Sequence, residues 1–342
     1  MSALSEADRN LGLLAGAGEW WPNPHLLIRP FMRREAVLSS RIEGTQASVA
    51  DLVLFEASPR ASSAPDVREV ANYVRALELG VREDRALPIS LRLMRELHGE
   101  LMADVGGAHL TPGEFRTSQN WIGPPGCTLN QATFVPPPPE DMRDALDAFE
   151  KYLHKESDLP PLIRLAIAHY QFEAIHPFLD GNGRVGRLLV TLLLDEWKLL
   201  PQPLLYLSAF FDRRRSEYYQ LLLGVSVAGN WGDWITFFLT GIAEQSTDVV
   251  DRARRLFALR ERYRAELHSA RSSALPLKLV DYLFEQPAVT VAQARNLLDV
   301  SPRAARMNVA KLEEAGIVRE FTKKARNRIY IAPEILDLLR EP

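Results

Sequence analysis

The chain has 342 residues, of which 46% are hydrophobic and 25% charged, as in a globular protein of two or three domains. Its net charge of −3 argues against nucleic-acid binding by the whole chain and leaves only a local basic patch open. A single cysteine, Cys127, excludes an intramolecular disulfide, and with no long apolar run and no signal-peptide pattern we expect a cytoplasmic protein without a membrane span.

The first 30 residues are predicted to be a leader that ends in a poorly helical connection, Trp20 to Pro24. A helix is predicted over about 31–44, because apolar residues recur there at helical spacing and Gly44 suits a helix stop. Glu43 lies at the C-terminal end of this helix, where the helix dipole disfavours an acid. An acid at this position indicates a cationic partner elsewhere in the chain, and the alternative is that the Glu43 side chain is simply solvated.

A polar loop follows over 57–66, and then helices over 67–81, with Asp66 as the candidate cap, and 90–102. Helical spacing disappears over 111–135, which has a Gly-Pro-Pro-Gly turn and is predicted to form a short hairpin. Residues 136–139 are a stiff proline connector. Two helices then follow over 140–154 and 159–175, and His169 in the second is predicted to be a hydrogen-bonded core histidine.

The stretch from His176 to Arg187, HPFLDGNGRVGR, concentrates residues suited to phosphate chemistry. His176 is its one side chain whose ordinary pKa lets it accept a proton near neutral pH. Asp180 is a hard oxygen ligand of the kind that Mg²⁺ takes beside phosphates. The apolar run over 185–200 predicts a helix whose N-terminal amides attract anions. Arg184 and Arg187, at i and i+3, lie on one side of its first turn and suit phosphate oxygens.

Two other interpretations of this stretch are weaker. Gly181, Gly183 and Gly186 satisfy the dinucleotide-binding pattern G-x-G-x-x-G, but that pattern requires a preceding buried strand, and residues 162–175 have the pattern of a helix. A structural turn between two helices explains the glycines but not the histidine, the aspartate and both arginines. The stretch therefore predicts a nucleotide phosphate site.

At every fixed position the stretch resembles the signature H-x-F-x-D/E-G-N-G-R-x-x-R of the Fic family, whose members typically transfer AMP from ATP to a protein hydroxyl. The resemblance implies a helical fold, with His176 as the general base and Phe178 as a core anchor. It also implies that Asp180 binds Mg²⁺, and that the nucleotide is bound by Asp180, Gly181, Asn182, Gly183, Arg184 and Arg187.

The resemblance extends to two segments upstream of the signature. Ser39, Glu43 and Gly44 match the inhibitory motif S/T-x-x-x-E-G/N of Fic proteins whose inhibitory segment is N-terminal. In that family the glutamate pairs with the second arginine of the signature, here Arg187, and hinders productive binding of the γ-phosphate. The segment 111–135 would be the flap, a hairpin that aligns a target segment by strand addition. A plain surface excursion is the alternative.

After the signature, helices are predicted over 204–211, 216–223 and 235–244, and Arg213 to Arg215 are predicted to be a solvated charge run. Four aromatic residues are expected to pack, with adenine contact left open: Tyr206, Tyr219, Trp231 and Trp234. The stretch 247–271 is rich in arginine and glutamate, and it predicts a solvent-exposed helix that connects two parts of the protein.

Residues 275–342 differ in kind. Helices over 276–284, 290–298 and 302–315, followed by strands over 317–321 and 328–331, predict a winged helix-turn-helix. Between Ser301 and Arg328 there are eight Lys/Arg residues against three Glu. Arg303 and Arg306 lie near the start of the third helix, and phosphate contacts are expected on the wing from Lys323, Lys324 and Arg326. A module for protein contacts or dimerisation is the alternative.

The sequence thus predicts a mainly α protein with a small β-hairpin flap. Its expected parts are an N-terminal helical region (1–90), a Fic catalytic core (91–245), a connecting helix (246–274) and a winged helix-turn-helix domain (275–342). The expected function is that of a protein adenylyltransferase, autoinhibited by pairing of Glu43 with Arg187, which uses ATP and Mg²⁺ and modifies a Ser, Thr or Tyr hydroxyl of a target protein. Alternatives are removal of AMP by the same site, another nucleotide donor, and a DNA-binding regulator with a Fic-like sensor body. A homodimer is left open.

Overall fold

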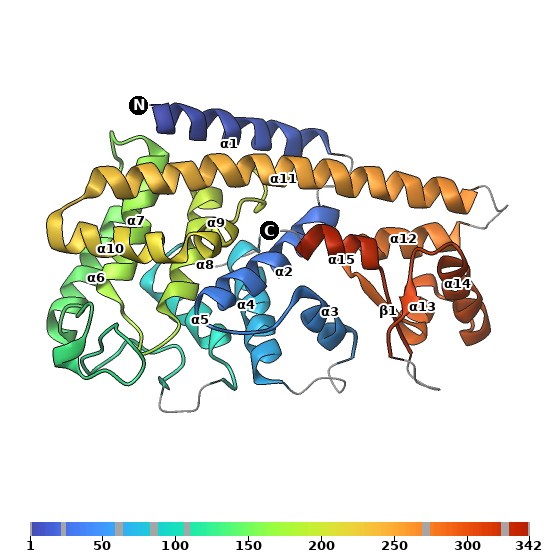
Figure 1. Cartoon of the computed structure of the whole chain (residues 1–342), viewed down its shortest axis with the longest axis horizontal. Helices are drawn as coiled ribbons and strands as arrows, with labels where there is room; N and C mark the ends of the chain where they lie inside the picture. Colours follow the sequence, from blue (N-terminus) through green and yellow to red (C-terminus); the bar gives the residue numbers. More distant parts are fainter. Residues whose placement is uncertain are drawn as a thin grey trace.

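A computed structural model describes residues 2–21, 25–58, 64–82, 88–105, 110–268, 274–322 and 328–340. Within these ranges the protein is mainly helical with one small sheet, which confirms the predicted fold class (Figure 1). The helices that precede the signature are α1 (Ser2–Trp20), α2 (His25–Ile42), α3 (Val49–Ala57), α4 (Pro65–Val81), α5 (Leu91–Leu101), η2 (Leu129–Gln131), α6 (Pro139–His154) and α7 (Pro161–Ile175). After it come α8 (Asn182–Glu196), α9 (Ser208–Arg213), α10 (Arg215–Ala228) and α11 (Trp231–His268).

Helix α1 corrects the prediction of a leader over the first 30 residues. It runs along α11 on one side of the molecule (Figure 1). Ala7, Leu11 and Leu14 recur at i, i+4 and i+7 and are buried, which gives α1 the apolar stripe of a packed helix. The connection predicted over 20–24 falls partly on residues 22–24, which lie outside the described residues.

Helix α11 replaces a predicted helix and the exposed connecting helix after it with one continuous element, so the predicted boundary between 245 and 246 falls inside it. The residues that bury one side of its second half are Val249, Ala253, Leu256, Tyr263 and Leu267. Their spacing is hidden in the sequence by the many charges on the opposite side. Residues 269–271 of the predicted range lie outside the described residues.

Helix α2 begins six residues before its predicted start and continues through Pro30. Leu26 and Leu27 are buried ahead of this proline, and their packing offsets the cost of a proline inside a helix. Gly44, with φ of +106°, ends the helix as predicted. The prediction that Asp66 caps the next helix is wrong, since its carboxylate accepts the Gln46 N–H instead, at 2.9 Å.

The predicted flap hairpin is reduced to a single antiparallel bridge between Ile122 and Phe134. Pro124 and Pro125 have no N–H group to extend a ladder, and residues 129–131 turn into η2. Arg213 and Arg215 are exposed, as expected of a solvated charge run, and Arg213 and Arg214 also pair with Glu244, at 3.3 and 2.8 Å.

The C-terminal part consists of α12 (Leu275–Glu285), β1 (Ala288–Thr290), α13 (Val291–Leu298), α14 (Pro302–Glu314), β2 (Arg319–Glu320), β3 (Ile329–Ile331) and α15 (Pro333–Arg340). The three strands form an antiparallel sheet in the order β1-β3-β2. We call this part, α12 to α15, the C-terminal module. Its helices and hairpin follow the predicted order, while β1 and α15 were not predicted. Helix α14 exposes Arg303 and Arg306, and the wing residues Lys323, Lys324 and Arg326 lie outside the described residues.

Among the described residues, no helix has the length and apolarity needed to cross a membrane.

Candidate active site

His176 ends helix α7 in a left-handed backbone conformation, with φ of +50°. Such a conformation is uncommon for a residue with a side chain, and the following Pro177 also prevents the helix from continuing. Arg116 and Asn120 hold it there by donating to the His176 carbonyl, at 2.9 and 3.4 Å. The Arg116 side chain is buried and also donates to the carbonyl of Pro137. The flap segment therefore fixes the orientation of the candidate base.

The imidazole of His176 has its protonation set by its surroundings. Its Nδ1 lies 3.2 Å from the carbonyl of Glu173, so Nδ1 carries the proton and Nε2 is left with a free electron pair. Burial lowers the pKa of His176 to about 4, with smaller opposing effects from the carbonyl of Glu173 and the carboxylate of Glu43. The ring is therefore neutral at physiological pH and able to accept a proton.

The loop between α7 and α8 is held by Asn182. Its side-chain oxygen accepts the N–H of Phe178 and its amide donates to the Phe178 carbonyl, both at 2.8 Å. This side chain thus shapes the loop between α7 and α8, and its contact with phosphates stays a prediction. Phe178 is fully buried and stacks on His98, at 3.8 Å between ring centroids, as expected of a core anchor.

The sequence predicted that Arg184 and Arg187 lie on one side of the first turn of α8, but their guanidinium groups do not converge on one point. Arg184 is buried and pairs with Glu69 of α4, with its other nitrogen 3.6 Å from Asp180. Arg187 turns to α2 instead. Positions i and i+3 of a helix differ by about 60° in direction, and each arginine has a different carboxylate within reach. Only Arg187 lines the cavity described below.

Arg187 is bound by the residues of the predicted inhibitory motif. Its Nε donates to the Ser39 hydroxyl at 2.8 Å, and its Nη2 donates to the Ser39 carbonyl at 2.9 Å and to the Glu43 carboxylate at 2.6 Å. Burial disfavours the charged form of both side chains, but their mutual attraction outweighs this effect. Arg187 therefore lowers the pKa of Glu43, and Glu43 raises the pKa of Arg187. The guanidinium expected to bind a phosphate is therefore occupied by an internal anion.

Glu43 also lies over the N-terminal end of α8. A Cβ atom at Gly183 would collide with the Glu43 carboxylate and would lie 2.9 Å from Nη1 of Arg187. A glycine at this position therefore lets the carboxylate reach the first turn of the helix, where backbone N–H groups and the helix dipole attract anions. The carboxylate therefore lies where the end of the helix favours an anion.

A cavity of about 480 Å³ brings these residues together. Its polar end is formed by Glu43, Glu173, His176, Gly183 and Arg187. The rest of its wall comes from the flap and from the helices α7 and α10: Ile122, Gly123, Thr133, Phe134, Tyr170, Ala174, Tyr218, Tyr219, Leu222, Leu223 and Ser226. Charged side chains together with a mostly apolar lining suit a ligand that has both phosphates and an aromatic base.

Glu173 was not among the predicted site residues. Its Oε1 is buried and has no hydrogen-bond partner among the described residues. Burial raises the pKa of Glu173 to about 7, which Glu43 adds to and Arg187 opposes. Its position three residues before His176, on the same face of α7, is the signal in the sequence that points to it.

His98 supports the loop from below and was also missed. Its Nδ1 accepts the N–H of Gly113 at 2.9 Å, so its Nε2 donates to the Asp180 carbonyl, at 3.1 Å. Burial lowers the pKa of His98 to about 4, which keeps this neutral tautomer. Nothing in the spacing of the sequence connects residue 98 with residue 180.

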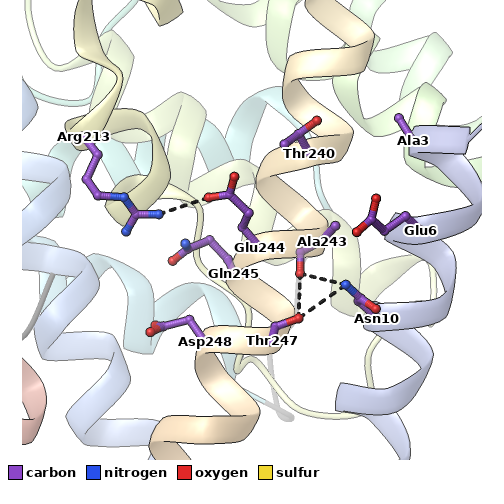
Figure 2. A pocket seen from close by; sticks show the side chains of 10 residues that line it. All are labelled: Ala3, Glu6, Asn10, Arg213, Thr240, Ala243, Glu244, Gln245, Thr247 and Asp248. Atoms are coloured by element: carbon purple, nitrogen blue, oxygen red, sulfur yellow. Dashed lines mark hydrogen bonds and ion pairs between the residues drawn. The ribbon is translucent and has the colours of Figure 1, made fainter.

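A second cavity, of about 580 Å³, lies between α1 and α11 and contains none of the predicted site residues (Figure 2). Asn10 crosses it to the carbonyl of Ala243 and the hydroxyl of Thr247, at 3.2 and 3.3 Å. Arg213 pairs with Glu244 in its wall. It is larger than the cavity at His176, but Asn10, Arg213 and Glu244 in its wall bind partners on neighbouring helices and no predicted site residue lines it, so the candidate site is placed in the smaller cavity.

The chemistry of the donor set fits Mg²⁺ held mainly by a nucleotide. Asp180 has a half-exposed side chain and uses one carboxylate oxygen to accept the Gly181 N–H, at 2.7 Å. The described residues contain no cluster of three or more His, Cys, Asp or Glu side chains that would hold a metal ion by themselves. Mg²⁺ is commonly bound by one or two carboxylates together with substrate phosphates and water, and Asp180 suits that role.

Comparisons with known proteins point to one family. The model of the Fic/DOC family N-terminal region matches residues 1–82, and the Fic/DOC family model matches residues 88–194. The protein adenylyltransferase Fic of Drosophila virilis is 34% identical over 167 residues, and that of Drosophila erecta 32%. Each match covers 48% of this chain and 30% of the fly protein, so the chain spans less than a third of these relatives.

Solved structures share the fold. A Fic family protein from Desulfovibrio desulfuricans G20 superposes with a TM-score of 0.60 at 18% identity, covering 97% of this chain and 96% of that one. Fic-1 of C. elegans gives a TM-score of 0.58 at 23% identity, over 75% and 73% of the two chains. With both family models matched in sequence and the same fold in these structures, the chain belongs to the Fic/DOC family.

Proposed function

We propose that this protein transfers AMP from ATP to a hydroxyl group of a target protein, and that α2 holds it in an inactive state. The observation that carries the proposal is that His176 and Arg187 open onto one cavity whose anion-binding end is occupied by Glu43. The fly relatives named protein adenylyltransferase Fic support the same activity.

The cavity suggests how ATP would lie. The N-terminal amides of α8 and the guanidinium of Arg187 would bind the phosphates, since both offer positive charge and donors in a partly buried place. The apolar region beside Tyr219, Leu222 and Leu223 would take the adenosine. Asp180 would hold Mg²⁺, which would neutralise charge on the phosphates.

In the proposed reaction, Nε2 of His176 accepts the proton of a target Ser, Thr or Tyr hydroxyl. The hydroxyl oxygen attacks the α-phosphorus, and a new phosphorus–oxygen bond forms. The bond from the α-phosphorus to the bridging oxygen of the β-phosphate breaks, and pyrophosphate leaves with the electron pair. Arg187 and the amides of α8 stabilise the charge that develops on it. The flap would present the target segment beside His176.

Glu43 would act as the brake. With its carboxylate on Arg187 and over Gly183, the γ-phosphate of ATP meets negative charge and an occupied guanidinium. The Glu43→Gly variant is expected to label itself and proteins of a lysate with AMP from labelled ATP much more strongly than the parent. Labelled GTP, UTP and CTP in parallel reactions report the donor. If the Glu43→Gly variant is no more active than the parent, the brake is assigned to the wrong residue.

We also propose that the enzyme contacts duplex DNA through α14. Arg303 and Arg306 are exposed on the first turns of this helix, while Ala305 and Val309 face the core of the module. Binding of a duplex by the full chain should weaken with salt, and replacing Arg303 and Arg306 by alanine should reduce the slope of log affinity against log salt by about 2. Lys278, exposed on α12, provides the control. An unchanged slope in the Arg303/Arg306 variant would speak against this face.

A further inference from the structure

Helix α2 is held on two opposite sides by different parts of the protein. On one side, Glu35, Ser39 and Glu43 follow at i, i+4 and i+8 and face the site. Glu35 is buried and accepts the hydroxyls of Ser208, at 2.5 Å, and Tyr73, at 3.2 Å. Ser39 and Glu43 bind Arg187. This side of α2 therefore fits the catalytic part of the molecule.

Arg33 lies two residues before Glu35, and so points about 200° away from it around the helix axis. Its guanidinium is buried and donates to the carbonyl of Glu285 and the side-chain oxygen of Gln286, both at the C-terminal end of α12. Its Nε donates to Glu56 of α3, at 2.7 Å. All these groups lie on the side of α2 that faces the C-terminal module.

A second link joins α2 to the module through α11. Arg34, also buried, lies 3.5 Å from Asp248 of α11, which is one of the residues shown in Figure 2. Asp248 binds Arg252 at 2.8 Å, and Arg252 donates to the Leu338 carbonyl of α15. Helix α2 also packs against α12 and α15 on this side and against α8 and α9 on the other (Figure 1).

Both sides of α2 are bound through buried groups, and Glu43 is the more exposed contact. The Arg33 side chain is 6% exposed and its partner Gln286 on the module is buried, as Glu35 and Ser39 are on the other side, so separating either set would leave donors and acceptors without partners. The side chain of Glu43, in contrast, is 33% exposed and reaches Arg187 from the end of the helix. Where the helix lies is therefore decided largely by the buried contacts, and the carboxylate of Glu43 follows.

We infer that the C-terminal module keeps the brake closed, because the contacts of Arg33 with Glu285 and Gln286 hold α2 where Glu43 reaches Arg187. The inference rests on the proposed function of α2 as an inhibitory helix and adds the element that controls it. A ligand or partner that moves the module away from α2 would release Arg187 for a phosphate. Transfer of AMP is then coupled to whatever the module binds.

The test changes the module at a residue remote from the cavity. Gln286→Ala removes the oxygen that accepts from Arg33, and also the amide that donates to the carbonyl of Val53 at 3.4 Å. Self-labelling with AMP from labelled ATP is expected to rise about five-fold or more, which is the lower range of couplings between linked sites. Arg33→Lys is the second variant, since a lysine keeps the charge beside Glu56 but cannot fork onto both acceptors of α12.

Two comparisons separate this inference from general loosening of the fold. Arg29→Gln changes an exposed arginine one turn earlier on α2, which lies 3.9 Å from Glu78, and should leave labelling at the parent level. In the Glu43→Gly background, Gln286→Ala should add nothing, because the brake is already absent. Circular dichroism and thermal unfolding are used to check that each variant is folded. If Gln286→Ala does not fold, labelling by Arg33→Lys tests the inference.

Each outcome decides something. The coupling is supported if Gln286→Ala and Arg33→Lys raise labelling in the parent protein but cause no further rise in the Glu43→Gly background. If Glu43→Gly raises labelling but neither module variant does, the module does not hold the brake, although the proposed function stands. A further rise in the double variant overturns the route through α2. If Glu43→Gly does not raise labelling, the assignment of Glu43 as the brake is wrong, and this inference fails with it.

Discussion

Two carboxylates, those of Glu43 and Glu173, flank one guanidinium, that of Arg187, beside a neutral imidazole. Glu43 pairs with Arg187 directly, and Glu173 is held close to it against the backbone at Gly186, where a Cβ atom would collide with its carboxylate. The carboxylate of Glu43 therefore offsets the charge of Arg187 inside the site. In the proposed function, this pairing and the binding of a triphosphate exclude each other.

The first prediction concerns His176. His176→Ala in the Glu43→Gly background should abolish labelling, since it removes the imidazole that accepts the hydroxyl proton in the proposed reaction. Affinity for ATP should change little, because the phosphates are bound by α8 and Arg187. Labelling and a direct ATP-binding measurement on the same variant check both parts. Labelling that persists in this variant would remove His176 from the role of base.

A second prediction follows from the pKa of His176. A base must be unprotonated, so with a pKa of about 4 the rate should be constant across neutral pH and fall only as the pH drops towards 4. Glu43 raises the pKa of His176, so in the Glu43→Gly variant the fall in rate should occur at a still lower pH. An ordinary histidine would give a fall near pH 6.5. The pH dependence of kcat/KM of the Glu43→Gly variant distinguishes the two.

Glu173 gives a third prediction, for stability. Its pKa is about 7 in the folded protein against an ordinary 4.5, so the folded state binds the proton more tightly. The stability that this group contributes is complete below the unfolded pKa and is lost as the pH rises through the folded value. The free energy of unfolding should therefore fall between these values by roughly 3 kcal/mol at most.

Glu173→Gln, which cannot ionise, should remove this part of the fall. Urea unfolding of the parent and the variant across the same pH range provides the measurement. Glu43, whose pKa is lowered, contributes stability that is lost as the pH falls, in the opposite direction to Glu173, so the two contributions are told apart by their sign. Parallel curves for the two proteins would contradict the raised pKa.

At the scale of elements, the contact between α2 and α8 is the one on which the proposed regulation depends. Ser39→Ala leaves Nε of the buried Arg187 without its partner, at a cost of about 1 kcal/mol to the closed state. Labelling should rise about five-fold, less than in Glu43→Gly. Ser40→Ala is a matched control, because the neighbouring hydroxyl is also buried but has no hydrogen-bond partner among the described residues. Equal effects of the two substitutions would show that they act through helix packing instead.

The sequence predicted this contact because the residues at both of its ends match short motifs. Ser39, Glu43 and Arg187 follow from these motifs alone, whatever the path by which α2 approaches α8. What the sequence does not contain is direction: Arg184 turns to Glu69 on a neighbouring helix, and Asn182 folds back on Phe178. Arg184 is oriented by a partner distant in the chain, whereas Asn182 is oriented by the backbone of Phe178, four residues earlier. Neither orientation follows from the spacing of the motif.

Elements were missed where their local pattern was weak. The sequence predicts a leader in place of α1, because glycines and other small residues interrupt the apolar stripe that packs on α11. In the second half of α11, charges outnumber the buried positions, so an amphipathic helix was predicted to be exposed. The predicted hairpin of the flap is limited to one bridge, because its prolines suit a turn but have no N–H group to donate to a neighbouring strand.

At the scale of the molecule, α11 makes the catalytic part and the C-terminal module one structure. Its first half packs against α7, α9 and α10, and its second half against α12 and α15 (Figure 1). The signals of these contacts lie in residues far apart in the sequence. A chain divided at residue 245, as the sequence suggested, would cut a continuous helix.

The last prediction tests this continuity. Leu256 lies in the second half of α11 and is 1% exposed, so Leu256→Ala should cost about 2–5 kcal/mol through lost burial and the cavity left behind. Because α11 belongs to both parts, calorimetry should show a single unfolding transition that moves to lower temperature as a whole. Arg254→Ala, at an exposed position of the same helix, should leave it in place. If the Leu256 variant instead unfolds in two steps, with the catalytic part unaffected, the two parts are separate units, and α11 cannot carry the position of the module to the brake.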